Sequence, residues 1–325
     1  MRWIMVLLTG ALCVVGPYAK AAEPIKVRLG ILSGAAQAAL VVAVEKGFFA
    51  QHGFVVEARP LVGGVQGNQA IAAGQVDWSA GGVEPTIIAA ASGLPFKPYA
   101  MYAKGGDSYG VLARKNAGIT TVQDLAGKTV ALTPGTAPVQ GFEELLQSGG
   151  VPVGSVHRVN ASFTTMGQML VQGSVDAMVG IEPYLTLTQH ELKANAVMIS
   201  RLGRFVQGGG FFYISDAWAA AHPDKIEDAV AALWDAEQFV RHNPQEAASI
   251  EASFIKADAS VIQATFQYLR FDPTIDAFTV KAFDSTAAYL LKEKLIPHAV
   301  NAADVLAPAI KMEASLRQKM PEALQ

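Results

Sequence analysis

Two stretches of this sequence decide the fold: residues 74–85 read GQVDWSAGGVEP, and residues 173–183 read GSVDAMVGIEP. They align with one gap, and in each an apolar run of strand length lies between a glycine turn and a helix start. A repeated unit of this kind indicates two similar halves, although short α/β units also resemble one another by chance. The identical pairs are Gly74 and Gly173, Val76 and Val175, Asp77 and Asp176, Glu84 and Glu182, and Pro85 and Pro183.

The residues around the first copy alternate between strands and helices. Residues 26–32 alternate polar and apolar side chains and stop at Ser33-Gly34, which predicts a strand and a turn. Apolar residues follow at helical spacing over residues 40–48, and residues 55–62 and 76–80 predict two further strands. Strands alternating with helices of this length imply a parallel sheet covered by helices on both faces.

The same order restarts near residue 128. Residues 128–133 predict a strand, a turn follows, and residues 139–146 carry apolar side chains at helical spacing before Gly149-Gly150. Right-handed crossovers place the strand-to-helix loops of each sheet on one edge. We therefore predict a second lobe that copies the first.

Glycine runs mark the expected crossings between the lobes. Gly105-Gly106 lies between the two copies, residues 208–210 are all glycine, and such runs supply the backbone freedom that hinges need. After Ser215 the chain is strongly helical, and these helices must pack on an existing lobe. We predict that residues 24–105 and 213–325, including the C-terminal helices, form a discontinuous first lobe, and that residues 106–212 form the second.

The first residues are typical of a secretory signal peptide. A charged start, an apolar run over residues 4–15 and small residues before Glu23-Pro24 follow in the usual order, which predicts that residues 1–21 are removed on export. The apolar run is shorter than the ~20 residues that a membrane-spanning helix needs. The single cysteine, Cys13, lies inside it, so the mature chain has no thiol for a disulfide or a metal.

Composition and missing motifs exclude several classes of function. A net charge of −3 without a basic run offers nothing to a nucleic-acid backbone. The six histidines lack metal-ligand spacing, and the chain carries no nucleophile elbow, P-loop or dinucleotide fingerprint. We therefore expect no metal, no cofactor and no enzymatic activity.

Short motifs in a fixed order carry a family resemblance. They are AVEKGFF at residues 43–49 with HGF at 52–54, the turn at residues 74–77, DLAGK at 124–128 leading to Val130, TPGT at 133–136, and residues 173–184. In these motifs the chain resembles the nitrate/sulfonate/taurine class of ABC-transporter solute-binding proteins, whose fold is shared with thiamine-pyrimidine-synthesis proteins. The resemblance implies an α/β, two-lobed periplasmic-binding-protein (type II) fold, in which each lobe is a mostly parallel sheet flanked by helices and the ligand cleft lies between the lobes.

The same resemblance implies a function. A monomer would capture a small anionic or zwitterionic solute, such as a sulfonate, taurine or nitrate, by lobe closure in the periplasm, and would dock transiently on the permease and ATPase of an inner-membrane importer. The alternative solute is a thiamine-precursor pyrimidine or another aromatic molecule. A cleft enzyme related to pyrimidine synthase is a third possibility, but the mature chain lacks the cysteine-rich motif of the eukaryotic branch of that family.

Candidate ligand contacts follow from where the strands end. Ligands bind open parallel sheets at the carboxyl ends of the strands, where the unpaired N–H groups and the dipole of a helix start favour negative charge. One loop of small residues lies there in each lobe, and the two loops would together form a cage of amides, or else they are ordinary helix caps that hold water. These residues are Ser33, Gly34, Ala35 and Ala36 in the first lobe and Thr133, Gly135, Thr136 and Ala137 in the second.

Glu84 and Glu182 end equivalent strands, so both are expected to point toward the same cleft. A carboxylate there can receive an amine or an amino-pyrimidine, or it can cap its own helix. Other residues near the strand ends would suit a flat or aliphatic ligand, although core packing accounts better for an aromatic ring at any one of these positions. These further candidates are Gly82, Gln66, Phe163 and Tyr184.

Overall fold

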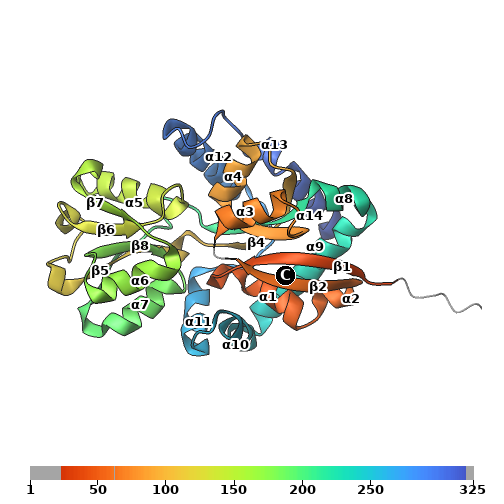
Figure 1. Cartoon of the computed structure of the whole chain (residues 1–325), viewed down its shortest axis with the longest axis horizontal. Helices are drawn as coiled ribbons and strands as arrows, with labels where there is room; N and C mark the ends of the chain where they lie inside the picture. Colours follow the sequence, from red (N-terminus) through yellow and green to blue (C-terminus); the bar gives the residue numbers. More distant parts are fainter. Residues whose placement is uncertain (1–22, 62, 320–325) are drawn as a thin grey trace, which may run out of the picture.

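The computed structural model describes residues 23–61 and 63–319, so the predicted signal peptide lies outside the described residues. The chain forms two lobes, each built on a five-stranded sheet (Figure 1). The first sheet has the order β2-β1-β3-β10-β4 and the second β7-β6-β8-β5-β9. The predicted two-lobed α/β architecture is therefore confirmed.

The two sheets share one design. In the first, β1 pairs in parallel with β2 and β3, and β10 runs antiparallel between β3 and β4. In the second, β6 pairs in parallel with β7 and β8, and β5 runs antiparallel between β8 and β9. The strands of the first sheet are β1 (Ile25–Leu32), β2 (Phe54–Leu61), β3 (Trp78–Gly82), β4 (Phe96–Lys104) and β10 (Gly209–Ser215), and those of the second are β5 (Tyr109–Arg114), β6 (Thr129–Leu132), β7 (His157–Asn160), β8 (Ala177–Ile181) and β9 (Ala196–Arg201).

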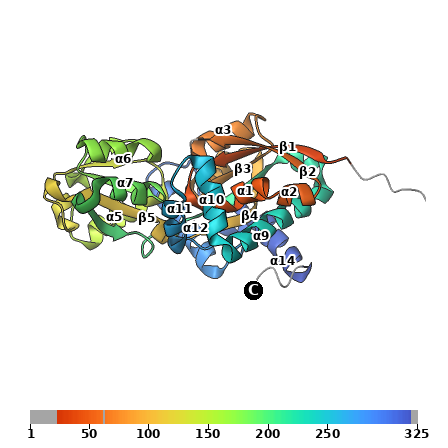
Figure 2. The ribbon, with the colours of Figure 1, turned by 90° about the horizontal axis from the view of Figure 1, so that it is seen from below.

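Helices lie on both sides of each sheet (Figures 1 and 2). Each sheet accordingly has a separate cluster of buried apolar side chains on each of its faces. The first lobe contains α1 (Ala38–Glu45), α2 (Phe48–Gln51), α3 (Gly64–Ala72) and α4 (Val83–Ala91), and the second α5 (Ala137–Ser148), α6 (Phe163–Gln172) and α7 (Tyr184–Leu192).

The repeated Gly-x-Val-Asp motif has the same structural role in both lobes. The Asp77 carboxylate accepts a hydrogen bond from the Arg28 backbone N–H at 2.9 Å, and the Asp77 N–H donates to the Arg28 carbonyl at 2.9 Å. Asp176 makes the same pair of bonds with Thr129, at 3.0 and 2.8 Å. The chain bends at Asp77, which these bonds hold in place, so the third strand begins at Trp78 and not at residue 76 as expected.

A left-handed glycine divides the first predicted helix. The periodicity predicts one helix over residues 40–48, whereas the structure has α1 and then α2, with Gly47 between them at a φ of 72°. Only glycine adopts this conformation without steric strain. The apolar face nevertheless continues, because Leu40 and Phe49 lie in the same core cluster.

The C-terminal helices pack mainly on the sheet and helices of the first lobe. Helix α9 contacts α1 and β4, α14 contacts β4, and α12 contacts α4. They also reach the second lobe, because α11 contacts α7 and the Tyr289 hydroxyl on α12 donates to Glu143 on α5 at 2.9 Å. These helices are α8 (Asp216–Ala221), α9 (Ile226–His242), α10 (Pro244–Ile255), α11 (Ala259–Thr265), α12 (Ala277–Lys292), α13 (Ala302–Val305) and α14 (Ala307–Lys319).

The two glycine runs lie side by side where the chain crosses between the lobes. The Gly105 N–H donates to the Gly208 carbonyl at 3.0 Å, and Gly105 and Gly209 have φ values of 151° and 138°. A Cβ atom at Gly106 would lie 2.0 Å from the Val206 carbonyl oxygen, so the close approach itself requires glycine. The chain is back in the first sheet at Gly209, so the expected boundary between residues 212 and 213 falls inside β10.

Candidate functional site

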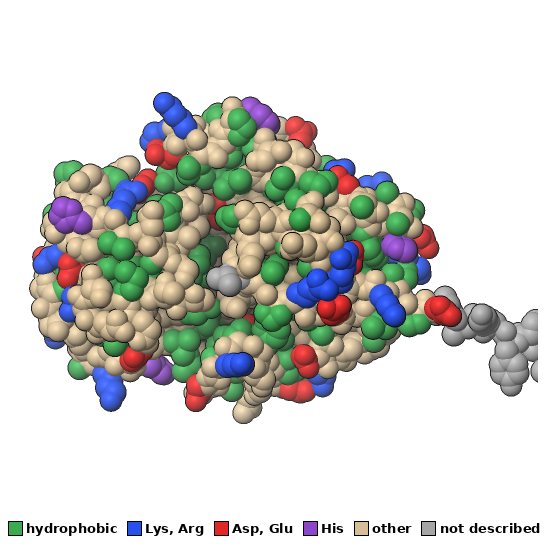
Figure 3. Space-filling view, in the orientation of Figure 1, with side chains coloured by type: hydrophobic (Ala, Val, Ile, Leu, Met, Phe, Trp, Pro, Cys, Tyr) green, Lys and Arg blue, Asp and Glu red, His purple; other side chains and the backbone are tan. Residues whose placement is uncertain are grey.

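A cavity of about 730 Å³ lies between the lobes, at the edge where the strand-to-helix loops of both sheets meet. Figure 3 shows the surface hollowed there, with hydrophobic side chains at its rim. Its apolar wall draws on both lobes and on the C-terminal segment: Leu32, Ala36, Val65, Pro85, Ile88, Pro134, Pro138, Phe163, Ile181, Leu269 and Leu295.

Most of the candidate residues line this cavity. The loops expected to face each other do so, and the side chains at the ends of β3 and β8 reach the same space. The candidates on the wall are Ser33, Gly34, Ala36, Gln66, Gly82, Glu84, Thr133, Gly135, Thr136, Phe163 and Glu182.

Three candidates lie elsewhere. Ala35 and Ala137 are fully buried in the apolar cores, because each begins a helical turn whose first side chain points back into its own lobe. Tyr184 does not line the cavity either; burial raises the pKa of its hydroxyl, and Ser33 of the other lobe only partly offsets this rise. The loop at Ala137 still contributes to the site, but through its backbone N–H.

Several wall residues carry no local sequence signal for binding. Gln37 and Tyr102 line the cavity and hydrogen-bond each other at 2.5 Å. Leu269 and Leu295 reach it from the C-terminal segment, far along the chain from either repeat. Only the return of the C-terminal segment to the cleft places these two leucines, so no pattern around them could have identified them.

The two equivalent glutamates have different surroundings. Glu182 accepts a hydrogen bond from the Thr186 N–H at 3.1 Å, so it caps α7, and Arg201 lies 2.6 Å from its other oxygen. Arg201 in turn donates to the Asp107 carbonyl and stacks over the Tyr268 ring at 3.8 Å. Glu182 is thus a neutralised, structural carboxylate on the cavity wall.

Glu84 has no cationic partner among the described residues. It lies in the first turn of α4 and is 4% exposed, and the backbone N–H groups of Glu84 itself and of Ala137 in the other lobe act to lower its pKa. Burial nevertheless raises its pKa to about 7, because these N–H groups only partly offset the loss of water around the carboxylate. Glu84 therefore titrates near neutral pH.

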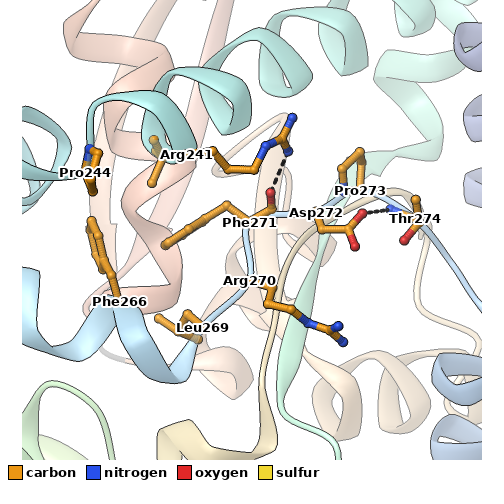
Figure 4. Close-up of a pocket in the computed structure, with 10 residues that line it drawn as sticks. Arg241, Pro244, Phe266, Leu269, Arg270, Phe271, Asp272, Pro273 and Thr274 are labelled. Atoms are coloured by element: carbon orange, nitrogen blue, oxygen red, sulfur yellow. Dashed lines mark hydrogen bonds between the residues drawn. The ribbon is translucent and has the colours of Figure 1, made fainter. Parts of the chain in front are cut away.

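A second hollow, of about 510 Å³, lies between the end of α9 and the segment that follows α11 (Figure 4). There Arg241 donates to the Phe271 carbonyl at 2.7 Å, and the Thr274 N–H donates to Asp272 at 2.9 Å. Both bonds hold the backbone of residues 271–274 in place. We therefore assign this hollow to the packing of a hydrogen-bonded loop.

The segment at residues 270–274 is bonded to the end of β4, directly before the glycine crossing. The backbones of Arg270 and Lys104 exchange two hydrogen bonds, at 2.7 and 2.9 Å, directly before Gly105. The Lys104 ammonium is 1% exposed, bonds the Thr274 carbonyl at 2.8 Å and lies 3.2 Å from Asp272. The last residue of β4 is therefore held rigidly, which leaves the glycines after it to absorb any lobe movement.

The described part of the chain has no helix that is both long and apolar enough to cross a membrane. Within residues 23–61 and 63–319, no group of three or more histidine, cysteine, aspartate or glutamate side chains is placed to hold a metal ion.

Known proteins with this architecture include binding proteins and an enzyme. The putative aliphatic sulfonates-binding protein of Bacillus subtilis (strain 168) is 24% identical over 86% of this chain and 85% of that protein. The alkanesulfonate-binding protein SsuA from Xanthomonas axonopodis pv. citri, bound to MOPS, is 23% identical over 89% of this chain and 99% of that chain, with a TM-score of 0.74. A mutant of the desulfurization enzyme DSZB in complex with biphenyl-2-sulfinic acid is 18% identical over 90% and 99%, with a TM-score of 0.70.

A protein-family model matches most of this chain. The model described as NMT1/THI5 like matches residues 35–247, which span the first helix, the whole second lobe and the return of the chain to the first sheet. That is more than half of the 325 residues. The chain belongs to the NMT1/THI5-like family.

Proposed function

We propose that this protein is the exported, periplasmic solute-binding component of an ABC importer and that it captures a small organic solute between its lobes. The observation that carries the proposal is the cavity of about 730 Å³, which is walled by loops of both lobes, beside a pair of glycine crossings. A solute there would bridge the lobes and stabilise their closed arrangement. The permease and ATPase of the importer would recognise that arrangement.

The cavity favours a solute with an apolar body. Its volume lies in the range of pockets that hold drug-sized ligands and far exceeds what nitrate or taurine fills. Its wall is largely apolar, with hydroxyl and amide groups from Ser33, Gln37 and Thr136. An organic sulfonate matches both features and agrees with the sulfonate-binding relatives.

Saturating solute is expected to stabilise the protein by about 2.7 kcal/mol at a hundred times its dissociation constant, because the solute binds only the folded state. Differential scanning fluorimetry over sulfonates, nitrate, bicarbonate, thiamine precursors and aromatic acids measures this as a rise of several degrees in Tm. The absence of a shift with every compound would contradict the proposal.

Two exposed valines give a matched control. Val65 lines the cavity and is 63% exposed, whereas Val55 is 50% exposed on β2 and does not line it. V65W is expected to obstruct the cavity and abolish the ligand-induced rise in Tm, and V55W is expected to retain it. Equal shifts in both variants would place binding outside the cavity.

The likeness to a desulfurization enzyme favours a second candidate function, in which the solute reacts in the cleft. Mass spectrometry of the bound solute separates the two functions. Under the transport proposal, the solute is recovered unchanged after long incubation with purified protein. Consumption of the solute would support the enzyme.

A further inference from the structure

The charge of the cavity wall restricts the solute. Of the described residues that line the cavity, none is lysine, arginine or histidine, and two are glutamate. Glu182 is paired with Arg201, but Glu84 is not paired with any cation within residues 23–61 and 63–319. Glu84 is already buried without a positive partner within the described structure. A solute that carries only negative charge would therefore place a second uncompensated charge beside this carboxyl group.

Two helix starts partly offset the cost that burial imposes on the ionised form of Glu84, and its carboxyl group can accept a further hydrogen bond. The first turn of α4 and the first N–H of α5, a helix of twelve residues, both face its carboxyl group, and helix starts stabilise negative charge. Its Oε1 atom is buried and has no hydrogen-bond partner among the residues that the structure describes. A buried acceptor without a partner is costly, so a donor on the solute would be strongly favoured.

We infer that Glu84 selects the solute by accepting a hydrogen bond from an ammonium or other N–H group, so that the solute is a zwitterion or an amine with an apolar body and not a simple anion. This inference rests on the proposed function. The acidic group of a zwitterion would lie toward the loop at Ser33-Gly34, which lines the same cavity. Glu84 would thus bind the nitrogen of the solute and not its sulfonate group.

The test uses a pair of compounds that differ in one group: 2-(cyclohexylamino)ethanesulfonate and 3-cyclohexylpropane-1-sulfonate, in which a CH₂ replaces the NH₂⁺. Calorimetric titration of the mature protein is expected to show the amine binding about ten- to a hundred-fold more tightly than the carbon analogue. A ratio of this size is what one hydrogen bond to a charged group contributes to affinity. E84Q is expected to bring the ratio close to one. The matched control is E237Q, which alters another buried glutamate that does not line the cavity, and it is expected to keep the ratio.

A measurement on the unaltered protein covers the case in which E84Q does not fold. The affinity for the amine is expected to rise about ten-fold between pH 6 and 8, as Glu84 ionises around its pKa of about 7, while that of the carbon analogue does not rise. The other titratable groups that face Glu84, Tyr109 and Tyr213, stay neutral there because burial raises their pKa values. Glu182 on the same wall is held by Arg201.

Three outcomes would overturn the inference. Equal affinities for the two compounds, unchanged in E84Q, would leave the proposed function intact and remove the role of Glu84. Tighter binding of the carbon analogue, weakening as the pH rises, would mean that protonated Glu84 donates to an anion. No binding of either compound, together with no response in the wider Tm screen, would contradict the proposed function itself and this inference with it.

Discussion

W78A is expected to lower the free energy of unfolding of the first lobe by about 3–5 kcal/mol, the usual cost of removing a large buried aromatic side chain. Trp78 is fully buried at the start of β3, in the centre of the cluster beneath the first sheet. The remaining side chains cannot close over the resulting cavity because they belong to β-strands and helices fixed by their own pairing. The ring centroids within 5.5 Å of the indole are those of Phe49, Phe54, Phe212 and Trp218.

Chemical denaturation followed by far-UV circular dichroism measures this loss. F278A is the matched control, because Phe278 on α12 is 55% exposed, and its loss is expected to cost less than about 0.5 kcal/mol. A fall in stability for W78A no larger than that of F278A would show that the aromatic cluster does not hold the first lobe together.

E251Q is expected to raise the free energy of unfolding by about 4 kcal/mol at pH 8 and by less than about 1 kcal/mol at pH 5. Glu251 on α10 is fully buried, and neither of its carboxyl oxygens has a hydrogen-bond partner in the described part of the chain. Burial raises its pKa to about 8, so the folded protein keeps a proton that the unfolded chain has already lost. Folding is therefore favoured at low pH, and that advantage disappears as the pH rises from 5 to 8.

Glutamine at position 251 removes this dependence because it is neutral at every pH. The difference in stability between E251Q and the unaltered protein, measured by denaturation at several pH values, isolates the contribution of Glu251 from that of the other buried glutamates. E246Q serves as the control, since Glu246 lies on the same helix, is exposed, and pairs only with Lys46 at 2.8 Å. It is expected to change stability by less than about 1 kcal/mol with no trend between pH 5 and 8; a trend as large as that of E251Q would refute the assignment.

The sequence predicts the repeated parts of the molecule well, because the information there is local. Strand periodicity and glycine turns locate β1, β2 and β6 to within two residues, and the loops between strands and helices place Ser33 and Thr136 on the cavity wall. The duplicated Val-Asp motif is informative for the same reason, since each aspartate bonds the strand beside it in its own lobe.

The parts that the sequence does not predict depend on contacts between distant segments. Glu84 and Glu182 occupy identical positions in the repeat, yet Arg201 pairs with only one of them, and nothing near either glutamate indicates which. Leu269 reaches the cavity only because residues 269–274 are fastened to Lys104. Differences of this kind arise when the two lobes come together, so they are absent from the local pattern.

The adjacent crossings have a consequence for protein engineering. All five strands of the second sheet lie in one continuous stretch, from Tyr109 to Arg201, and the chain enters and leaves that stretch where Gly105 bonds Gly208. The segment is thus a cassette: cut out, it retains every strand and both of its cores, and the gap it leaves can be bridged by a very short linker. Replacing the second lobe of one family member with that of another would combine the second-lobe half of one binding site with the first-lobe half of the other in a single step.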